Sequence, residues 1–404
     1  CPCQINYKLY KTISYRYSFL ISFYALVYYK HNGCYSNNMH TVIIGGGFAG
    51  IKAALELANK QTGKITLISN SPYFNCHASL YSILAGKSKR QSKVTLSDIF
   101  AHINGVDIVQ DEVISINPEK NIVRSKDVAY EYDKLILSPG MVPDNLGISG
   151  VKSHTLSIRN LEDIDKLRKR LEANTKEKIA IIGAGPAGVE FAGALSEWYE
   201  AIDEVADITL IDSGNRVLPT FSKTASRLAS RKLRDMGIKI QLKRSVQEVK
   251  SSHIVLNNGV IPAKNIIWAA GEILSPIITK HVQYFGIEEN RVQVDDFLEA
   301  YEDIYVIGDC AKASGSGTAD GAIYMAEYVA KHIIHTMMGR KSRPYHHKPD
   351  IKSVPIGSNW AYVEQSGIYV SGKLGSLTRS EIEHRLYRQI MPRVQAFSAL
   401  NPHS

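Results

Sequence analysis

An α/β fold with two Rossmann-like dinucleotide-binding domains and a small C-terminal region is predicted by two segments that repeat one pattern. Residues 40–69 read HTVIIGGGFAGIKAALELANK…KITLIS, and residues 177–212 read EKIAIIGAGPAGVEFAGALSEW…DITLID. Each holds a short run of β-branched residues, a glycine turn, a stretch with helical periodicity and a second apolar run. This order predicts a β-α-β unit with parallel strands in each segment.

Three glycines in each segment fit the spacing GxGxxG between the first strand and the helix. The first permits a tight turn, the second lets a pyrophosphate approach the backbone, and the third lets the helix pack on the sheet. The N-terminus of the helix offers free N–H groups and a positive dipole end to the phosphates. The predicted binding residues are Gly45, Gly47, Phe48, Ala49 and Gly50 in the first segment and Gly183, Gly185, Pro186, Ala187 and Gly188 in the second.

The residue that ends the second strand differs between the two segments. Asp212 ends DITLID, where a carboxylate can accept from the 2′-hydroxyl of a ribose, and this favours NADH over NADPH. Arg216 follows four residues later and could soften the preference. In the first segment the position is Ser69, followed by Asn70. Both can hydrogen-bond a ribose, but more weakly than an acid.

The composition is that of an ordinary globular protein, with 404 residues of which 44% are hydrophobic and 22% charged. This length allows two or three domains. The formal net charge of +9 suits an anionic cofactor or an anionic membrane surface and gives no argument for nucleic acid. We predict no metal site, because the adjacent His346 and His347 lack further ligands at suitable spacing and are expected to be solvated.

Residues 1–38 differ from the rest of the chain. They hold eight of the 22 tyrosines, three of the five cysteines and no acidic residue, and the first methionine is Met39. We expect translation to begin at Met39, with residues 1–38 as upstream sequence. The alternative is a signal or anchor formed by SFLISFYALVYY, which is short for a membrane span and is followed by no small-residue cleavage site. Cys76 and Cys310, the remaining cysteines, imply no disulfide framework, so a reducing, cytoplasmic compartment is expected.

Three further segments identify a family. They are YDKLILSPG at residues 132–140, VIPAKNIIWAAGEILSP at 260–276 and DIYVIGDCA at 303–311. In this order, and with the two glycine segments, they resemble the FAD-dependent pyridine nucleotide-disulfide oxidoreductase superfamily. The resemblance implies an FAD-binding domain in two pieces, with an NAD(H)-binding domain between them. The implied bounds are 39–148 and 273–335 for the FAD domain, 149–272 for the NAD(H) domain and 336–404 for the C-terminal region.

The resemblance also implies roles for single residues. Asp309, in IGDCA, would bind the ribityl chain of FAD, and Glu190, in GVEFAG, would lie near the junction of nicotinamide and flavin as a catalytic residue. The linker SPG departs from the commoner ATG at Ser138 and Pro139. Further implied cofactor-binding residues are Val113, Ser138, Gly140, Gly271 and Gly308.

Within the superfamily the chain most resembles type II NADH:quinone oxidoreductases, through GAGPAGVEFAGALSE, IIWAAG and ISNSPYFNCHASLYSILAG. This implies an FAD-dependent NADH dehydrogenase and homodimer that passes electrons through the flavin to a quinone or similar small-molecule acceptor. The family usually carries paired glutamines on the helix after the Gly-Asp motif. Here that helix reads TADGAIYMAEYVAKHI, with Asp320, Tyr324 and Met325 in the neighbourhood. The quinone pocket is therefore reshaped, or the acceptor differs.

Cys76, in YFNCHASLY, leaves the mechanism open. NADH peroxidases, NADH oxidases and coenzyme A disulfide reductases cycle one flavin-proximal cysteine through a sulfenic acid or mixed disulfide. Their motif resembles this one in having Leu80 and Tyr81 after the cysteine, and a protonated His77 would lower the thiol pKa. The alternative is a small residue in the wall of the flavin pocket, which is also our interpretation of Cys310. A third hypothesis is a flavin-binding redox sensor or partner protein with little turnover.

The C-terminal region predicts a hairpin and an amphipathic helix. SVPIGSNWAYVEQSGIYVSGKLGSL indicates two strands around residues 365–367. In the tail, apolar residues recur every four positions beside arginines: Ile382, Leu386, Ile390 and Val394 with Arg385, Arg388 and Arg393. The helix either lies on a membrane surface, as in peripheral attachment to the inner face of the cell membrane, or packs on the core or a partner subunit.

Overall fold

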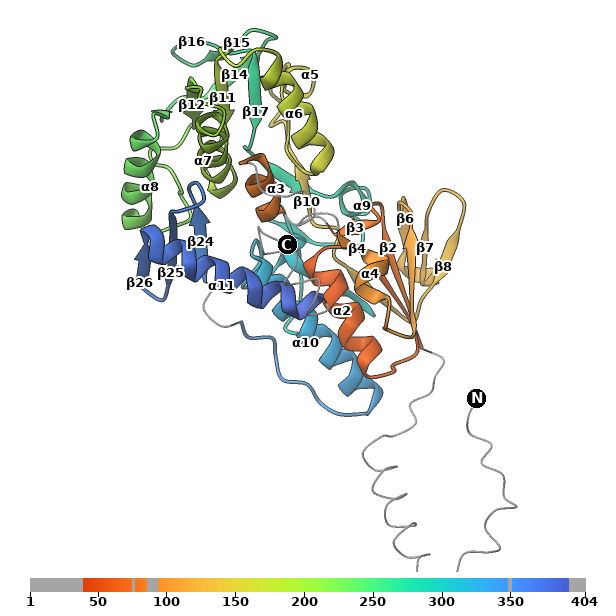
Figure 1. The fold of residues 1–404 in the computed structure, drawn as a ribbon. Coiled ribbons are helices and arrows are strands. Elements are labelled where there is room, and N and C mark those ends of the chain that lie inside the picture. The colour runs from red at the N-terminus through yellow and green to blue at the C-terminus, as the bar shows by residue number, and fades with distance from the viewer. Residues whose placement is uncertain (1–38, 75–76, 86–93, 348–350, 392–404) are drawn as a thin grey trace, which may run out of the picture.

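The structure, a computed structural model, describes residues 39–74, 77–85, 94–347 and 351–391. Residues 1–38 and Cys76, for which we made predictions, lie outside this range. Both predicted β-α-β segments are present and form separate parallel sheets, which confirms the α/β fold class. Figure 1 shows the two units one above the other, with the C-terminal strands and helix running along one side of both.

The first unit is built on a six-stranded sheet. Its order is β21 (Glu299–Tyr301), β22 (Ile304–Val306), β9 (Lys134–Leu137), β1 (His40–Ile44), β2 (Lys64–Ser69) and β5 (Val106–Gln110). All neighbours are parallel except β21 and β22. Two pieces of chain far apart in sequence thus share one sheet, because β22 pairs with β9.

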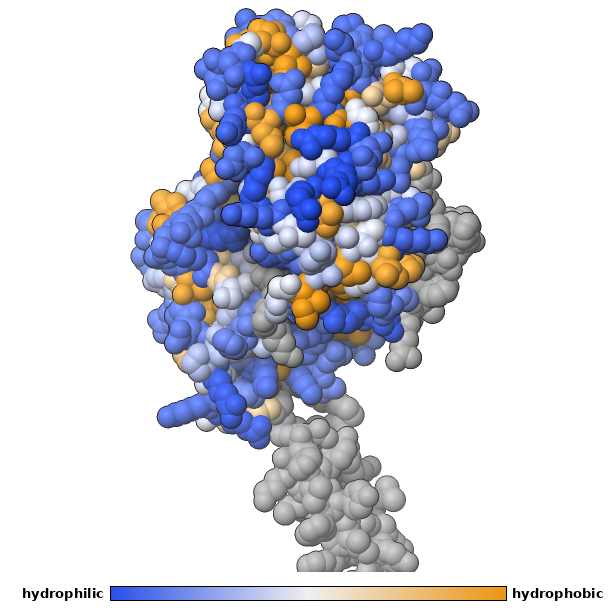
Figure 2. Space-filling view, turned by 90° about the vertical axis from the view of Figure 1, so that its left-hand side faces the viewer, coloured by the Kyte–Doolittle hydropathy of each residue, from blue (hydrophilic) through white to orange (hydrophobic). Residues whose placement is uncertain are grey.

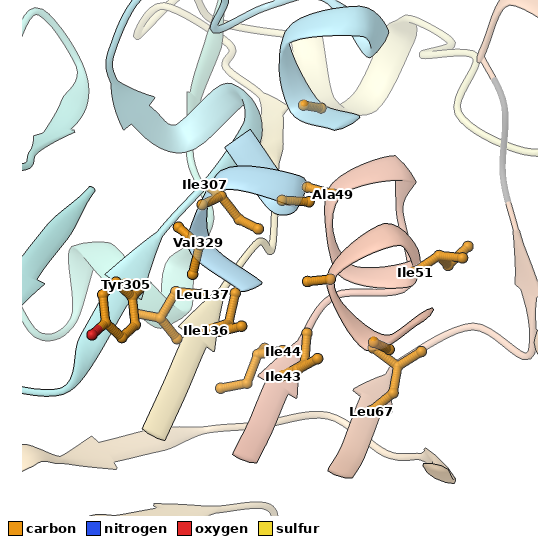
Figure 3. Packing of buried hydrophobic residues seen from close by; sticks show 14 of the residues in the cluster. Ile43, Ile44, Ala49, Ile51, Leu67, Ile136, Leu137, Tyr305, Ile307 and Val329 are labelled. Carbon is orange, nitrogen blue, oxygen red and sulfur yellow. The ribbon is translucent and has the colours of Figure 1, made fainter. Parts of the chain in front are cut away.

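Two helices cover this sheet and bury its apolar strands. Helix α2 (Phe48–Asn59) packs against α10 (Ala319–Met337). Figure 3 shows Ile43, Leu67 and Ile51, from β1, β2 and α2, in one hydrophobic cluster, and all three side chains are fully buried. Strands covered on both faces need continuous β-branched and aliphatic runs, which explains the sequence TVII. The buried strand and helix therefore hold the glycine turn between β1 and α2 in position.

The second unit is a four-stranded parallel sheet in the order β13 (Lys239–Gln241), β12 (Ile208–Ile211), β11 (Ile179–Ile182) and β17 (Asn265–Trp268). Its helices are α6 (Leu161–Ala173), α7 (Pro186–Glu200) and α8 (Lys223–Asp235). Two antiparallel linker strands, β10 (Met141–Pro143) and β18 (Glu272–Leu274), connect the units. Arg159 joins both linkers, because its guanidinium donates to the Met141 carbonyl at 2.5 Å and to Glu272 at 2.9 Å.

Helix α3 (His77–Leu84) belongs by sequence to the first unit but packs on the second. Leu80, Ile83 and Leu84 are buried in the hydrophobic cluster that surrounds α6 and α7. Arg168 of α6 donates to the carbonyls of Ile83 and Leu84 at 2.6 and 3.0 Å, and so binds the last turn of α3. This segment, which follows Cys76, is held by the second unit.

The C-terminal region bridges the two units. The predicted hairpin is confirmed as β25 (Ala361–Gln365) and β26 (Ile368–Ser371), and β24 (Lys352–Pro355) adds a third strand. Helix α11 (Gly372–Ile390) follows directly. Leu386 and Ile390 are buried against the first unit, so the core-packing alternative is confirmed for this face. The membrane alternative is wrong for these residues, and Arg393 and Val394 lie outside the described range.

The remaining elements are short. A meander on the first unit contains β6 (Ser115–Asn117), η3 (Pro118–Lys120), β7 (Ile122–Arg124) and β8 (Ala129–Glu131), and one on the second contains β14 (Val246–Val249), β15 (His253–Leu256) and β16 (Gly259–Pro262). The others are β3 (Tyr73–Phe74), β4 (Val94–Thr95), α4 (Leu96–Phe100), α5 (Val151–His154), α9 (Pro276–Thr279), β19 (Ile287–Glu288), β20 (Arg291–Gln293), η4 (Gly308–Cys310) and β23 (Ala311–Lys312).

Candidate functional site

The first glycine turn has the geometry that its spacing predicts. Gly45 has a φ of +111°, and a Cβ there would lie 2.1 Å from the Ser138 carbonyl oxygen. A Cβ on Gly50 would lie 1.9 Å from the Gly45 carbonyl oxygen, so this glycine permits the close contact between helix and turn. A Cβ on Gly47 would meet nothing within 4 Å. The second glycine therefore borders open space, where a phosphate can approach the backbone.

The second glycine turn repeats this geometry. Gly183 has a φ of +107° and Gly188 would bring a Cβ within 1.8 Å of the Gly183 carbonyl oxygen, whereas Gly185 borders open space. Neither α2 nor α7 has a side-chain cap at its N-terminus, so the first N–H groups of both helices are left for another acceptor. Each turn is thus a site suited to an anion. Phe48, Ala49, Pro186 and Ala187 lie in the first turn of these helices, as predicted.

A cavity at the carboxyl end of the first sheet brings together several predicted residues. It is lined by Gly45, Ser69, Asn70 and Val113, with Pro139 of the SPG linker nearby in its wall. The Ser69 hydroxyl donates to the Ser71 carbonyl at 2.8 Å, so its proton is already used within the loop. The cavity adjoins the glycine turn and has both apolar and polar residues in its wall.

Asp309 lies next to the first turn. A Cβ on the preceding Gly308 would lie 3.4 Å from the Ala49 side chain of α2. Gly308 also has a φ of +78°, a left-handed backbone conformation that favours glycine. The Asp309 carboxylate accepts from the Gly317 N–H at 3.0 Å. Burial raises the pKa of Asp309, and the negative charge of Glu272 adds to this. Gly140 also borders open space with a φ of +69°.

Ser138 contributes to the first turn from the linker. Its side chain is buried, and its hydroxyl lies 3.0 Å from the Ile44 carbonyl oxygen and 3.3 Å from that of Gly45. The serine thus contacts the turn rather than an open space. The departure from the ATG pattern introduces a hydroxyl that can hold the glycine turn in place.

Asp212 is placed as expected for a ribose-binding acid on the second unit. Its carboxylate accepts from the Ala184 and Gly214 N–H groups, both at 2.6 Å, which fixes it against the second glycine turn. Arg216 instead donates to the carbonyls of Leu218 and Phe221, at 3.3 and 2.9 Å. Because this guanidinium is engaged by its own loop, it gives no support to NADPH. Gly271, with a φ of +73°, lies beside Leu146 at the linker, 3.0 Å from an added Cβ.

Glu190 is the most perturbed carboxyl near these turns. It lies in the second turn of α7 and is 8% exposed. Burial raises its pKa to about 7, opposed by Arg379 and reinforced by Glu383. Arg379, on α11, lies 3.6 Å from Glu190 and 2.9 Å from Glu383, and it donates to the Ser353 hydroxyl at 2.9 Å. Sequence reasoning missed Arg379, because nothing in the local pattern of the tail distinguishes it from surface arginines.

The helix that usually carries paired glutamines has other contacts here. Asp320 pairs with Arg385 of α11 at 3.5 Å. Tyr324 stacks on His347, with ring centroids 5.2 Å apart, and Met325 is buried and accepts from the Gly308 N–H at 3.3 Å. His347 is 8% exposed, so the prediction that it is solvated is wrong: the chain after α10 folds back along this helix. His346 is exposed, as predicted.

Of Cys76 and Cys310, only Cys310 belongs to the described residues. Cys310 is fully buried, and its thiol lies 3.3 Å from the Ile307 carbonyl oxygen. Burial raises its pKa to about 12, so it is a poor nucleophile, as expected for a small buried residue. Cys76 lies outside the described residues, and its redox role stays a prediction.

The described part of the chain has neither a metal-binding cluster nor a membrane-spanning helix. In residues 39–74, 77–85, 94–347 and 351–391, no group of three or more histidine, cysteine or acidic side chains is placed to hold a metal ion. Over the same ranges, no helix combines the length and hydrophobicity that crossing a membrane requires.

Comparisons with known proteins agree with this geometry. The family model described as pyridine nucleotide-disulphide oxidoreductase matches residues 39–326. A type II NADH:quinone oxidoreductase of Staphylococcus aureus is 26% identical over 384 residues, which cover 85% of this chain and 94% of that protein. A probable NADH dehydrogenase of Dictyostelium discoideum is 26% identical over 345 residues and covers 76% of each.

Solved structures share the fold. The structure of NDH2 from Plasmodium falciparum in complex with NADH has a TM-score of 0.81 at 18% identity, covering 90% of this chain and 97% of that one. The sulfide:quinone oxidoreductase of Aquifex aeolicus has a TM-score of 0.76 at 22% identity, covering 89% and 92%. These likenesses extend beyond the family match into the C-terminal region.

Proposed function

Because the chain belongs to the pyridine nucleotide-disulphide oxidoreductase family, we propose that it is an FAD-dependent NADH dehydrogenase that passes electrons from NADH through the flavin to a quinone. The observation that carries this function is the pair of glycine turns. Each lies at the carboxyl end of a parallel sheet and borders open space at its second glycine. A chain with two such turns can hold two dinucleotides, which NADH-to-FAD electron transfer requires.

The first unit fits FAD. The N–H groups at the start of α2 face the open space beside Gly47 and would bind the pyrophosphate. The cavity lined by Ser69, Asn70 and Val113 would receive the adenosine, and the half-buried Asp309 would accept from a ribityl hydroxyl. When bound, FAD supplies the redox chemistry, while the protein supplies orientation and electrostatics.

The second unit fits NADH. Asp212 is held by two backbone N–H groups, and the remaining lone pairs of its carboxylate can accept from the ribose hydroxyls. A 2′-phosphate would meet this negative charge, and Arg216 is turned to its own loop. The preference is therefore for NADH over NADPH.

Glu190 would supply the proton of the reaction. NADH, a quinone and one proton give NAD⁺ and a quinol, so one proton must come from outside the dinucleotide. A buried carboxyl with a pKa of about 7 can hold and release a proton at neutral pH. Arg379, 3.6 Å away, stabilises the carboxylate that remains. Glu383 is 29% exposed and connects this buried pair to solvent.

The acceptor site would lie between α10 and α11. Asp320 and Tyr324 stand where related enzymes carry glutamines, and each is held in place by a partner: Arg385 for the acid and His347 for the ring. An aromatic and charged wall of this kind differs from a glutamine-lined one in the hydrogen bonds that it offers to a quinone oxygen. We therefore expect a quinone preference that differs from that of glutamine-bearing relatives.

The start of α11 would attach the protein to the inner face of a membrane. Ile368, Tyr369, Leu374 and Leu377 are 78%, 50%, 68% and 61% exposed, and Lys373 lies among them. Figure 2 looks at the molecule from the side on which β26 and the start of α11 lie, and it shows apolar groups separated by hydrophilic ones. Exposed apolar side chains beside a cation suit a lipid surface, where a quinone is dissolved. Homodimer formation stays a prediction.

Steady-state oxidation of NADH tests the proposed function. The full chain and its Cys76→Ser variant are compared with a short-chain menaquinone analogue as acceptor, and then with peroxide or a disulfide. The proposal expects equal quinone-dependent rates for both proteins. If quinone fails and only the wild type consumes NADH with peroxide or a disulfide, the enzyme is a single-cysteine reductase. A bound flavin that NADH reduces only very slowly would instead indicate a redox sensor.

A further inference from the structure

The cavity beside the first glycine turn lacks the acid that a ribose usually meets. Ser69 ends β2 at this position, and its hydroxyl donates to the Ser71 carbonyl at 2.8 Å while accepting from the Ser71 N–H at 3.3 Å. A Cβ on Gly46 would lie 2.8 Å from the same hydroxyl oxygen, so it is tightly enclosed. A second acceptor is needed if the ribose is to be held as firmly as by a carboxylate.

The neighbouring strand brings two acids to this point. Strand β5 is parallel to β2, with Ser69 paired to Gln110, and the Asp111 N–H donates to the Ser69 carbonyl at 3.0 Å. Carboxyl ends of parallel strands meet at one edge of a sheet, where ligands bind. Asp111 and Glu112 therefore follow β5 directly beside Ser69, and both line the cavity.

The two acids have different surroundings. The Asp111 carboxylate accepts from the Glu112 N–H at 2.8 Å and from the Tyr130 hydroxyl at 3.3 Å, which fixes it in the turn towards β8. A hydrogen bond from the Ser125 side chain is the largest cause of the lowered pKa of Asp111, and the hydrogen bonds from Glu112 and Tyr130 lower it further. Within the described residues, the Glu112 carboxylate has neither a hydrogen bond nor a salt bridge, although Lys280 lines the same cavity.

We propose that the Glu112 carboxylate accepts hydrogen bonds from the adenosine ribose hydroxyls of FAD, in place of the acid that Ser69 does not supply. Glu112 follows β5, the strand next to β2, and from there its carboxylate reaches the same ribose from the side. This inference rests on the proposed FAD site. Glu112 is a binding residue and takes no part in electron transfer.

Flavin binding tests this role independently of turnover. FAD is removed from the full chain, and the dissociation constant for added FAD is measured by flavin fluorescence for the wild type, Glu112→Gln and the Glu119→Gln control. Glu119 is an exposed acid on η3 outside the cavity wall. A hydrogen bond to a charged group stabilises by about 1.5–3 kcal/mol and one to a neutral group by about 0.5–1.5 kcal/mol, so Glu112→Gln, which keeps a neutral acceptor, should weaken FAD binding about 5-fold. Glu119→Gln should leave it unchanged.

Two further measurements identify the partner of the carboxylate. An FAD analogue with a 2′,3′-dideoxy adenosine should bind the wild type about 10-fold more weakly than FAD, whereas in Glu112→Gln, whose neutral amide oxygen is a weaker acceptor, the difference should fall to about 2-fold. The Ser69→Glu change, added to Glu112→Gln, should restore FAD binding by returning the acid to the end of β2. If Glu112→Gln binds FAD like the wild type, or discriminates against the analogue as strongly as the wild type does, the inference is wrong. If the wild type itself binds no FAD, the proposed function fails instead.

Discussion

Replacing Arg379 and Glu383 should move the pKa of Glu190 in opposite directions. The Arg379 guanidinium lies 3.6 Å from Glu190 and opposes the effect of burial, while Glu383 reinforces it. Arg379→Met removes the positive charge but keeps an unbranched side chain. Glu383→Gln removes the second carboxylate that pairs with Arg379 and keeps a side chain of the same size. The first change should raise the pKa of Glu190 from about 7, and the second should lower it.

The distance sets the size of the shift. At 3.6 Å, Coulomb's law with an effective dielectric constant of about 20 gives about 4.6 kcal/mol for a full pair of charges. One pKa unit corresponds to about 1.4 kcal/mol, so about 3 units is an upper limit. Arg379 is shared with Glu383 at 2.9 Å, which reduces its effect on Glu190. We therefore expect a rise of about 1 to 2 units in Arg379→Met and a smaller fall in Glu383→Gln.

The assay is the pH dependence of quinone-dependent NADH oxidation at saturating NADH. If the rate needs protonated Glu190, the rate should fall above about pH 7 in the wild type. This alkaline limb should move to higher pH in Arg379→Met and to lower pH in Glu383→Gln. Glu381→Gln is the matched control, since Glu381 is 72% exposed on the same helix and pairs with Arg388. Shifts of the same sign in both variants, or none, would refute the assigned role of Glu190.

Three other predictions follow from the same geometry. Gly185→Ala should raise the KM for NADH about 10-fold or more with FAD content and melting temperature unchanged, because its Cβ enters only the open ligand space. Gly188→Ala should destabilise the fold, because its Cβ would lie 1.8 Å from the Gly183 carbonyl oxygen. Equal melting temperatures for both variants would contradict this. Leu374→Ser combined with Leu377→Ser should weaken binding to anionic vesicles about 10-fold in a flotation assay without changing turnover of a short-chain quinone; unchanged binding would exclude the membrane surface. Folding raises the pKa of Glu190 from 4.5 to about 7, so the wild type loses stability as pH rises from 4.5 to 7, where the unfolded chain ionises this group more readily than the folded one. Glu190→Gln lacks this loss and should therefore have a higher melting temperature than the wild type above pH 7 but not below pH 4.5. A higher melting temperature at low pH alone would contradict the buried carboxyl.

The glycine turns were predictable because their requirements are local. The positive φ of Gly45 and the contact between Gly50 and the Gly45 carbonyl both lie within six positions of chain, and Gly47 between them borders open space. The strands were predictable for a similar reason, since β-branched runs such as TVII suit strands that are buried on both faces. The hairpin of β25 and β26 is also short-range.

Contacts between distant segments were not predictable from periodicity. Glu190 and Arg379 lie far apart in the chain, and their charges meet only because β24 packs on α7 and α11 packs on β24. The apolar face of the tail, for which a membrane surface and the protein core were both left open, is buried at Leu386 and Ile390, because an apolar stripe does not specify whether lipid or protein covers it. His347 is buried by its stack on Tyr324, which adjacent histidines in a basic loop do not indicate.

Anaerobic mixing tests the central claim most directly, because it follows the flavin itself. The full chain with bound FAD is mixed with NADH, the flavin absorbance is recorded, and a short-chain menaquinone analogue is then added. The account predicts that NADH bleaches the flavin rapidly and that the quinone restores its absorbance, in the wild type and in Cys76→Ser alike. A flavin that NADH does not reduce, or that quinone leaves reduced, would contradict the proposal that electrons pass from NADH through this flavin to a quinone.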